Sequence, residues 1–248
     1  MVAEDLPPKT ETVLYCEMLP RQRRVYDAFR DTYKAKILDK IQEEGMNRAG
    51  MYILEGLMKL RQICDSPALL KDPEDYGKDS IKLQELSKHI TEKTGNHKVL
   101  VFSQFLGMLA MVRDALEHHN IGYAYLDGSI SPKKRQAAIK HFQEEKDCRV
   151  FLISLKAGGF GLNLTAADYV YLMDPWWNPA VEQQAIDRVH RIGQKNNVFA
   201  YKMICKNTVE EKILQLQNKK RSLADDIISA EKSFLKTLDK NDVEFLFS

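Results

Sequence analysis

Apolar side chains recur every three or four residues in the early part of the chain. This spacing predicts two amphipathic helices between positions 21 and 63, because residues three and four apart lie on one face of a helix. The region from Gly45 to Gly50 separates them and predicts a helical hairpin. An alternating stretch at 12–17 predicts a short strand, and the Pro7-Pro8 pair predicts an extended segment over 1–10.

The pattern changes after position 80 to short apolar runs that alternate with helical periods. The apolar runs predict β-strands, at 98–103, 123–126, 149–153, 169–173 and 198–203. The other segments predict helices, at 106–118, 132–142, 179–192 and, with many charges, 209–231. Strands that alternate with helices are typical of an α/β domain with a mainly parallel sheet.

The overall charge is close to neutral. The chain has 37 basic and 35 acidic residues among 248, so any nucleic-acid contact has to come from local basic patches. Its cysteines lack the spacing of metal ligands, which predicts reduced thiols and no metal site; they are Cys16, Cys64, Cys148 and Cys205. No apolar run approaches a membrane span and no signal-peptide pattern is present, so we expect a soluble intracellular protein with no membrane partner.

The segment at 183–194 reads QQAIDRVHRIGQ and is the most informative stretch of the sequence. It follows a helix start, because Asn178 is suited to cap a helix and Pro179 to occupy its first position. On the predicted helix Gln184, Arg188 and Arg191 are spaced i, i+4 and i+7 and share one face. An amide and two guanidinium groups on one face suit phosphate oxygens. Taken alone, the same arginine spacing also fits a basic surface helix in salt bridges.

Four segments together resemble motifs of the Swi/Snf family of DNA-dependent ATPases, in helicase superfamily two. The 183–194 run, preceded by DPWWNP at 174–179, resembles motif VI. SLKAGGFGLNLTAAD at 154–168 resembles motif V, VLVFSQF at 99–105 resembles motif IV, and YLDGS at 125–129 resembles the segment after it. All four occur in the family's order. This context favours the phosphate-binding interpretation of the arginine-bearing helix.

The resemblance implies a fold and its division into parts. It implies an α/β fold with a RecA-like, mainly parallel sheet flanked by helices, an N-terminal helical protrusion and a C-terminal bracing helix. LRQICDSPALL at 60–70 is similar to the family's LRQICNHP signature, with Asp65-Ser66 in place of Asn-His. The expected parts are a linker from a first motor lobe, the helical protrusion, the RecA-like helicase C-terminal lobe, and a brace with a tail, at 1–19, 20–79, 80–207 and 208–248.

The resemblance also implies roles for individual residues. Arg188 and Arg191 are expected to act as arginine fingers on the terminal phosphate of ATP, a role that contributes a factor of roughly 10³ to 10⁵ in rate. The residues expected to face the nucleotide are Gln184, Gly159, Gly161 and Asn163. The residues expected to contact the DNA backbone are Ser103, Gln104, Phe105, Ser129, Lys156, Ala157, Gly158 and Trp177.

The glycine-rich stretch of motif V follows the end of a predicted strand, where open α/β sheets gather their ligands. Its glycines let the backbone turn tightly and approach a phosphate without a Cβ in the way. Many members of the family carry Thr-Arg where this chain has Leu155-Lys156. Lysine keeps the positive charge but loses the bidentate fork of arginine, so we expect phosphate binding with a less defined geometry.

Some of these residues have a second interpretation that the sequence leaves open. Residues 103–105 fit a polar cap on the following helix as well as a DNA contact. Asp127 in the DGS segment is best explained as a turn residue. The basic run at 133–135 fits a solvated helix face as well as further phosphate contacts. Trp177 either presents an aromatic edge to DNA or is buried together with Trp176.

The sequence lacks the residues that bind the phosphates and magnesium of ATP. It has no GxxxxGK[ST] loop, since Gly77-Lys78 is followed by Asp79, and no predicted strand ends in an acidic pair. We therefore expect ATP and Mg²⁺ to be held mainly by a first motor lobe outside this chain, and the isolated chain to be inactive. The predicted function is the second motor lobe of a Swi/Snf-type double-stranded DNA translocase or remodeller. Its expected partners are double-stranded DNA, the first RecA-like lobe of the same protein and DNA-bound proteins.

Other function classes fit the sequence less well. A DNA-binding or regulatory module with no role in ATP turnover does not need the complete Gln184, Arg188 and Arg191 face. The equivalent lobe of an RNA helicase usually shows HRxGRxxR in this place and lacks the helical insert before motif IV. A dinucleotide-binding enzyme would show GxGxxG spacing, which GGFG does not. The SLKAGG wording and the compact insert favour a cytoplasmic, nucleoid-associated bacterial protein over a nuclear eukaryotic one.

Overall fold

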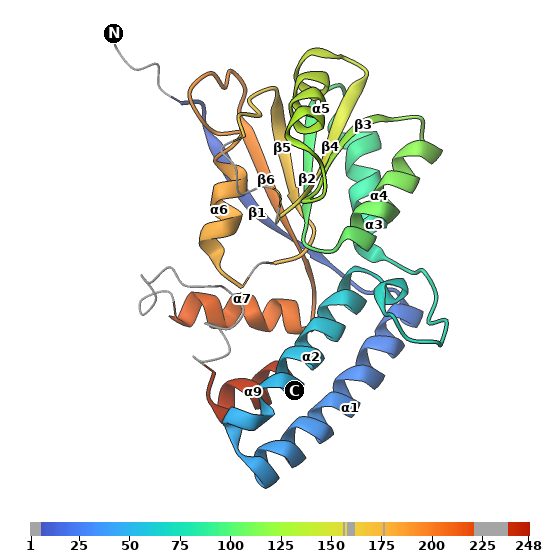
Figure 1. The fold of residues 1–248 in the computed structure, drawn as a ribbon, viewed down its shortest axis with the longest axis vertical. Helices are drawn as coiled ribbons and strands as arrows, with labels where there is room; N and C mark the ends of the chain where they lie inside the picture. The colour runs from blue at the N-terminus through green and yellow to red at the C-terminus, as the bar shows by residue number, and fades with distance from the viewer. Residues whose placement is uncertain (1–5, 156, 158–161, 176, 221–237) are drawn as a thin grey trace. The chain divides into compact units, whose positions relative to one another are not determined.

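The computed structural model in Figure 1 describes the chain except for residues 1–5, 156, 158–161, 176 and 221–237. The chain forms two compact units. The sheet unit comprises Met1–Leu14, Lys82–Asp174 and Ala180–Met203, and the helical unit comprises Tyr15–Ile81, Pro175–Pro179 and Ile204–Ser248. Each unit is therefore assembled from separate stretches of sequence.

The sheet has six strands in the order β1-β6-β5-β2-β4-β3. β2 pairs in parallel with β4 and β5, and the β3–β4 and β5–β6 pairs are also parallel. The N–H of Val198 donates to the carbonyl of Pro8, and the N–H of Lys206 donates to the carbonyl of Cys16. Residue numbers therefore rise in the same direction along both strands, so β1 is parallel to β6. The strands are β1 (Lys9–Cys16), β2 (Lys98–Ser103), β3 (Gly122–Leu126), β4 (Cys148–Ser154), β5 (Ala167–Leu172) and β6 (Val198–Cys205).

The central strands are continuous apolar runs because both of their faces are covered. Residues 99–102 of β2 and 150–153 of β4 are fully buried, as expected for the centre of a parallel sheet. Helices α4 (Leu106–His118) and α5 (Pro132–Glu144) pack against these strands. The remaining helices of this region are α3 (Ile81–Lys88), the π-helix η2 (His89–Lys93) and α6 (Pro179–Ile186). The predicted α/β fold with a RecA-like parallel sheet is confirmed.

The parallel register brings the motifs to one edge of the sheet. Ser103 at the end of β2 lies opposite Ser154 at the end of β4, and Phe102 lies opposite Leu172 of β5. Motif IV includes the end of β2, motif V begins at the last residue of β4, and the segment that leads to motif VI follows β5. We call this the carboxyl edge, and the opposite one, where the strands begin, the amino edge. Ligands of open α/β sheets bind at the carboxyl edge.

The helical unit contains the predicted hairpin, formed by α1 (Pro20–Glu44) and α2 (Met46–Asp65). The break between them is the single residue Gly45, which has a φ of +80° that other residues rarely adopt. Gly50, expected to belong to the break, lies inside α2. The other helices are η1 (Pro67–Leu69), α7 (Val209–Lys220) and α9 (Lys240–Leu246). The predicted extension of α7 to 231 falls outside the described residues.

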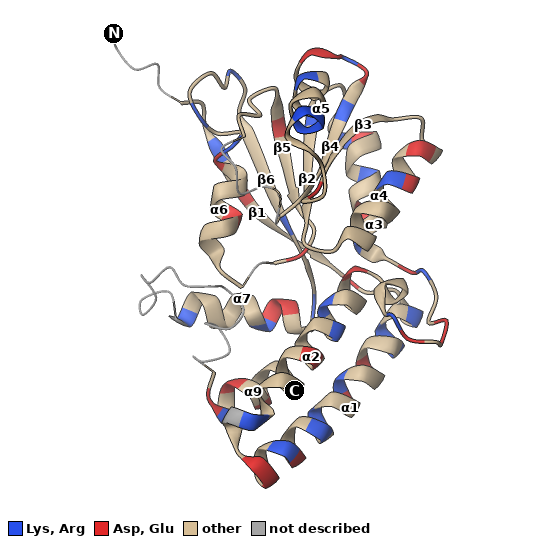
Figure 2. Ribbon diagram, in the orientation of Figure 1, with Lys and Arg blue, Asp and Glu red and all other residues tan. Residues whose placement is uncertain are grey.

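Charge is distributed unevenly over the helices, as Figure 2 shows. Both signs alternate along α1, whereas α5 carries Lys133, Lys134, Arg135 and Lys140 against the single acidic residue Glu144. Near-neutral overall charge therefore coexists with a locally basic helix. In the described part of the chain, no helix combines the length and the hydropathy that crossing a membrane requires.

Gln22 fastens the start of α1 to the end of α2. It is fully buried, and its Nε2 donates to the carbonyls of Ile63 and Cys64 at 2.8 and 3.1 Å. Its Oε1 accepts the N–H of Ile81 at 3.2 Å. The two carbonyls belong to the last turn of α2, where no intrahelical donor remains. One amide therefore satisfies three backbone groups of the helical unit.

Replacing Gln22 by methionine keeps the size of the side chain but removes the donor to the carbonyl of Ile63, the second donor to the carbonyl of Cys64 and the acceptor of the Ile81 N–H. We expect Gln22→Met to lower the free energy of unfolding by about 2 kcal/mol, measured by urea denaturation. Gln42→Met, at an exposed position of the same helix, is the matched control and should change it by less than about 0.5 kcal/mol. Equal effects of the two changes would contradict the bridging role of Gln22.

Candidate functional site

A buried carboxylate, Asp174, organises the carboxyl edge. The hydroxyl of Ser103 donates to Asp174 Oδ2 at 2.6 Å. The N–H of Gln104 lies 3.1 and 3.2 Å from the two carboxylate oxygens, and the N–H of Phe105 donates to Ser103 Oγ at 3.0 Å. Asp174 follows β5, so the residues of motif IV fold around the end of a neighbouring strand. The turn between β2 and α4 is therefore held by charge-assisted hydrogen bonds.

Ser103 holds the turn that precedes α4, whose N-cap residue is Phe105 and which has no side-chain cap hydrogen bond among the described residues. Its side chain is fully buried and its hydroxyl is committed to Asp174, whereas Gln104 and Phe105 are only half-buried. The expectation that Ser103 itself contacts DNA is corrected, because its buried hydroxyl donates to Asp174. The other interpretation, a polar cap on the following helix, is not seen as a side-chain cap bond in the described structure. The DNA contact expected of Gln104 and Phe105 stays a prediction.

The DGS segment after β3 forms a turn, as predicted for Asp127. Asp127 Oδ1 accepts the N–H and the hydroxyl of Ser129 at 2.8 and 2.6 Å, and Oδ2 accepts the hydroxyl of Tyr125 at 3.0 Å. These bonds lower the pKa of Asp127 below its usual value, and the bond from the Ser129 hydroxyl has the largest effect. Ser129 is exposed, and so are Lys133 and Lys134 at the start of α5. These three side chains are accessible to a phosphate backbone.

Motif V is described in part. The proposed site residues Lys156, Gly158, Gly159 and Gly161 lie outside the described residues. Ala157 is buried, and Asn163 is exposed with its carbonyl accepting Gln143 Nε2 at 3.0 Å. The motif continues into Leu164, whose N–H donates to the carbonyl of Arg188 at 3.1 Å. This bond connects motif V to motif VI within the sheet unit.

Helix α6 ends at Ile186, six residues before the predicted end at 192. The backbone then turns, because the carbonyl of Arg188 accepts the N–H of Leu164 instead of continuing an intrahelical ladder. Gln184 is exposed on α6, whereas Arg188 and Arg191 follow in the turns. The expectation that these three residues share one face of a continuous helix is therefore wrong. The tertiary bond from Leu164 holds the backbone of Arg188, while the N–H groups of Asp187 and His190 still donate to carbonyls four residues earlier.

Arg188 carries a buried guanidinium. Its side chain is 8% exposed, and its Nε and Nη1 find no hydrogen-bond partner among the residues that the structure describes. Burial, and then the like charge of Arg191, lowers the pKa of Arg188. Arg191 is exposed. Two neighbouring guanidinium groups, one of them largely desolvated, form a site that an anion would stabilise.

Gln194 holds the backbone around the arginine-bearing turn through its side-chain amide. The sequence alone did not identify it as a site residue. Its Nε2 donates to the carbonyls of Ala167 and Val189 at 2.7 and 3.3 Å. Its Oε1 accepts the N–H groups of Lys195 and Asn196 at 2.8 and 2.9 Å. A glutamine in a polar run gives no sequence signal of burial. The last residue of QQAIDRVHRIGQ thus ties motif VI to the beginning of β5.

Trp177 is buried in the helical unit. The Arg61 guanidinium lies 4.5 Å from the centroid of its ring, and Arg61 Nη2 donates to the carbonyl of Pro175. Gln217 Nε2 donates to the carbonyl of Trp177 at 3.0 Å. The ring is only 4% exposed, which corrects the expectation that Trp177 presents an aromatic edge to DNA. Burial, the alternative interpretation, applies to Trp177, and Trp176 lies outside the described residues.

Two of the four cysteines, all free and buried, come together in the helical unit beside an acidic residue. One ligand atom of each of Cys64, Cys205 and Glu210 lies within 4.8 Å of the others. Glu210 Oε2 already accepts the N–H of Cys205 at 3.0 Å, and Cys205 Sγ donates to the carbonyl of Cys64 at 3.3 Å. Among the described residues, the thiol of Cys205 and the carboxylate of Glu210 thus already serve hydrogen bonds at the start of α7.

The chain matches known families and solved structures. Residues 81–193 match the family described as Helicase conserved C-terminal domain, and residues 1–69 match the SNF2-related domain. The chain is similar to the Sulfolobus solfataricus SWI2/SNF2 ATPase C-terminal domain, with 35% identity and a TM-score of 0.76 over 96% of this chain and 97% of that one. It is also similar to the Sulfolobus solfataricus SWI2/SNF2 ATPase core in complex with dsDNA, with 37% identity and a TM-score of 0.78 over 97% of this chain and 50% of that one.

Curated relatives are much longer than this chain. An uncharacterized ATP-dependent helicase of Mycoplasma pneumoniae is 36% identical over 247 residues, which are 99% of this chain and 23% of the relative. The chain spans about a quarter or less of the length of the curated relatives that it matches.

The stacking of Arg61 on Trp177 gives a measurable expectation. Arg61→Lys keeps the charge but removes the planar fork that both stacks on the ring and reaches the Pro175 carbonyl. We expect it to lower the free energy of unfolding by about 2 kcal/mol and to shift tryptophan fluorescence to longer wavelength as the ring meets water. The measurement is urea denaturation followed by fluorescence.

Arg24→Lys is the matched control, because Arg24 is exposed on α1. It should leave both the stability and the emission maximum unchanged. An unshifted emission maximum in Arg61→Lys would show that Arg61 does not shield the ring.

Proposed function

This chain belongs to the SNF2 family of ATP-dependent helicases, as the C-terminal lobe of its motor, and we propose that it completes the site that hydrolyses ATP while holding double-stranded DNA. It would do so in a longer protein that also contains the first RecA-like lobe. Arg188 and Arg191 are the proposed arginine fingers. Opening and closing of the two lobes during turnover would move the DNA and displace proteins bound to it.

The desolvated guanidinium of Arg188 is the observation that carries this proposal. A buried charge that none of the described residues pairs with costs free energy until an anion reaches it. In an ATP-dependent family that anion is the triphosphate. When the terminal phosphate is transferred to water, negative charge spreads over its oxygens, and a guanidinium donating to them lowers the barrier. The exposed Arg191 adds a second positive charge beside it.

ATP and Mg²⁺ need ligands that this sequence does not contain. We propose that the first lobe holds the phosphates and Mg²⁺, as a GxxxxGK[ST] loop and an acidic strand end do in related ATPases. On this lobe the nucleotide would face Gln184 and Asn163, which are both exposed, together with Gly159 and Gly161. The chain on its own is therefore proposed to be inactive.

The carboxyl edge is the proposed DNA side. Gln104, Phe105 and the exposed Ser129 surround the strand ends there, and Lys156 with Ala157 and Gly158 would add a cation and backbone amides from motif V. Hydrogen bonds to phosphates position a protein on DNA without reading its sequence, so little sequence preference is expected. Duplex DNA is chosen over RNA because a similar solved structure is a complex with dsDNA.

The Leu164–Arg188 hydrogen bond supports coupling between the two sides. Motif V leads into Leu164, and the carbonyl of Arg188 is fixed by its N–H at 3.1 Å. A shift of motif V on binding DNA would therefore move the backbone of Arg188, the proposed arginine finger. A regulatory DNA-binding module without ATP turnover is the second candidate, but it leaves the buried charge of Arg188 without an anion.

Removing the guanidinium should abolish catalysis and spare DNA binding. In the full-length protein we expect Arg188→Ala to lower kcat for DNA-stimulated ATP hydrolysis by a factor of about 10³ or more, with the affinity for duplex DNA changed less than about twofold. Arg188→Lys should recover little, because a single ammonium cannot replace the fork. The control is Arg113→Ala, which removes a half-exposed arginine from α4. Turnover that persists in a folded Arg188→Ala protein would remove the finger role.

Lys156 is proposed to contact a DNA phosphate. Lys156→Ala should weaken duplex binding at low salt and reduce the slope of log K against log salt concentration by about 1, because one fewer counterion is released. Fluorescence anisotropy at a series of salt concentrations measures both quantities. Lys240→Ala, at an exposed position of α9, should leave the slope unchanged. An unaltered slope in Lys156→Ala would count against this contact.

A further inference from the structure

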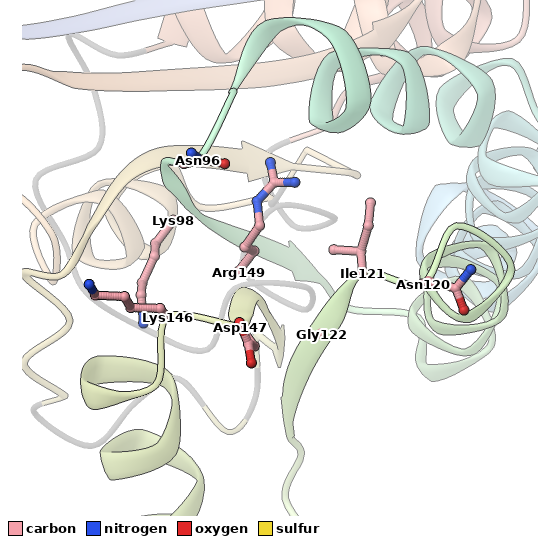
Figure 3. Close-up of a pocket in the computed structure, with 8 residues that line it drawn as sticks. All are labelled: Asn96, Lys98, Asn120, Ile121, Gly122, Lys146, Asp147 and Arg149. Atoms are coloured by element: carbon pink, nitrogen blue, oxygen red, sulfur yellow. The ribbon is translucent and has the colours of Figure 1, made fainter.

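The two halves of the amino edge differ in how their side chains are arranged. A cavity of about 770 Å³ opens where β2, β3 and β4 begin, and Figure 3 shows that its cations, Lys98, Lys146 and Arg149, point in different directions. These cations do not converge on one position. In the other half, where β1, β6 and β5 begin, several hydrogen bonds converge on the turn that carries Arg188 and Arg191.

The segment before β1 is attached to this turn. His190 Nε2 lies 2.8 Å from the carbonyl oxygen of Pro7. A carbonyl oxygen can only accept, so Nε2 carries the hydrogen and donates it. Lys9 Nζ also lies 3.7 Å from Asp187 Oδ1, which accepts Gln183 Nε2 at 2.8 Å. An ion pair at the surface adds little, so the bond from His190 is the stronger of the two attachments.

Pro7 and Pro8 make the attached segment stiff. Each proline ring fixes φ at about −65° and restricts the residue before it, so two consecutive prolines favour an extended backbone with little freedom. The carbonyl of Pro8 accepts the N–H of Val198 at 2.9 Å, at the start of β6. Two consecutive carbonyls are thus bonded to motif VI and to the sheet. The direction in which the chain approaches β1 therefore determines where the acceptor of His190 lies.

The two arginines of the turn are held from different sides. The carbonyl of Arg188 accepts the N–H of Leu164, which belongs to motif V. Arg191 follows His190 directly, and the side chain of His190 is bonded to Pro7. A displacement of motif V would therefore reach Arg188 first, whereas a displacement of the segment before β1 would reach Arg191 first.

We propose that Pro7-Pro8 is a rigid connector through which the position of the first motor lobe sets the position of Arg191, with His190 as the positioning residue. This inference rests on the proposed function, in which residues 1–19 lead from the first lobe into this one. Residues 1–69 match the SNF2-related domain, and the match to the similar SWI2/SNF2 ATPase core covers 50% of that chain. A change in the direction of the linker as the lobes close would move the Pro7 carbonyl and, through His190, the backbone of Arg191.

The test measures DNA-stimulated ATP hydrolysis by the full-length protein. His190→Leu removes the donor to Pro7 and should lower kcat about tenfold, because a misplaced guanidinium is lost to the transition state. KM for ATP and the affinity for duplex DNA should each change less than about twofold. His190→Gln keeps a side-chain N–H that can donate to the carbonyl, and it should restore kcat to within about threefold of the parent. Urea denaturation of each variant checks that it is folded.

The double variant Pro7→Gly/Pro8→Gly separates stiffness from the hydrogen bond. It keeps both backbone carbonyls but removes the fixed φ angles, so a rigid connector should lose kcat as it does in His190→Leu. Adding His190→Leu to the double variant should lower kcat no further than His190→Leu alone, because both changes interrupt one connection. Pro73→Gly, at an exposed position of the helical unit, is the matched control and should turn over as the parent does.

A parent-like kcat in His190→Leu or in the double glycine variant would overturn the connector, and so would effects of the two changes that multiply. Arg188→Ala in the same assay distinguishes this failure from that of the proposed function. If Arg188→Ala is inactive, a parent-like His190→Leu overturns the connector alone. Turnover that persists in Arg188→Ala overturns the proposed function and the connector with it.

Discussion

The carboxylate of Asp174 is the constraint on which the site depends. A fully buried carboxylate is tolerated only when donors surround it, and here the turn after β2 supplies them. The hydroxyl of Ser103 and the N–H of Gln104 converge on it, so the end of β5 and the start of motif IV form one rigid corner. Parallel pairing then places the end of β4 beside this corner. The three strand ends that precede the motifs are in this way fixed before any ligand binds.

The loop that precedes α6 makes its described contacts within the helical unit. Pro175–Pro179 belongs to the helical unit, although Asp174 before it and Ala180 after it belong to the sheet unit. Arg61, from the LRQICDSP segment, fills the interior of the loop, and Gln217 of α7 holds the Trp177 carbonyl. The segment that resembles the family's LRQICNHP signature thus has a physical role here, because its Arg61 contacts the Trp177 ring and donates to the Pro175 carbonyl.

The strands and most helices follow from local sequence pattern, and the site does so only in part. β2 runs over 98–103 as predicted, because an apolar run between polar ends has one stable place in a parallel sheet. The end of α6 could not be predicted, since it depends on a hydrogen bond from Leu164, which belongs to another segment. The burial of Trp177 likewise depends on Arg61, which is distant in sequence. Local patterns carry no information about such partners, so the sequence placed Arg188 and Arg191 on a helix where the structure has turns. Their catalytic role stays a proposal.

The hydrogen bond between Leu164 and Arg188 has a thermodynamic consequence. It joins the backbone of Leu164, near the end of motif V, to the backbone of Arg188 in the arginine-bearing turn. Binding free energies that act on one element are reciprocal: if DNA at the loop raises the affinity for the anion at Arg188 by some factor, that anion must raise the affinity for DNA by the same factor. If an anion at Arg188 strengthens the binding of DNA, then DNA must strengthen the binding of that anion by the same factor, and neither effect can exist without the other.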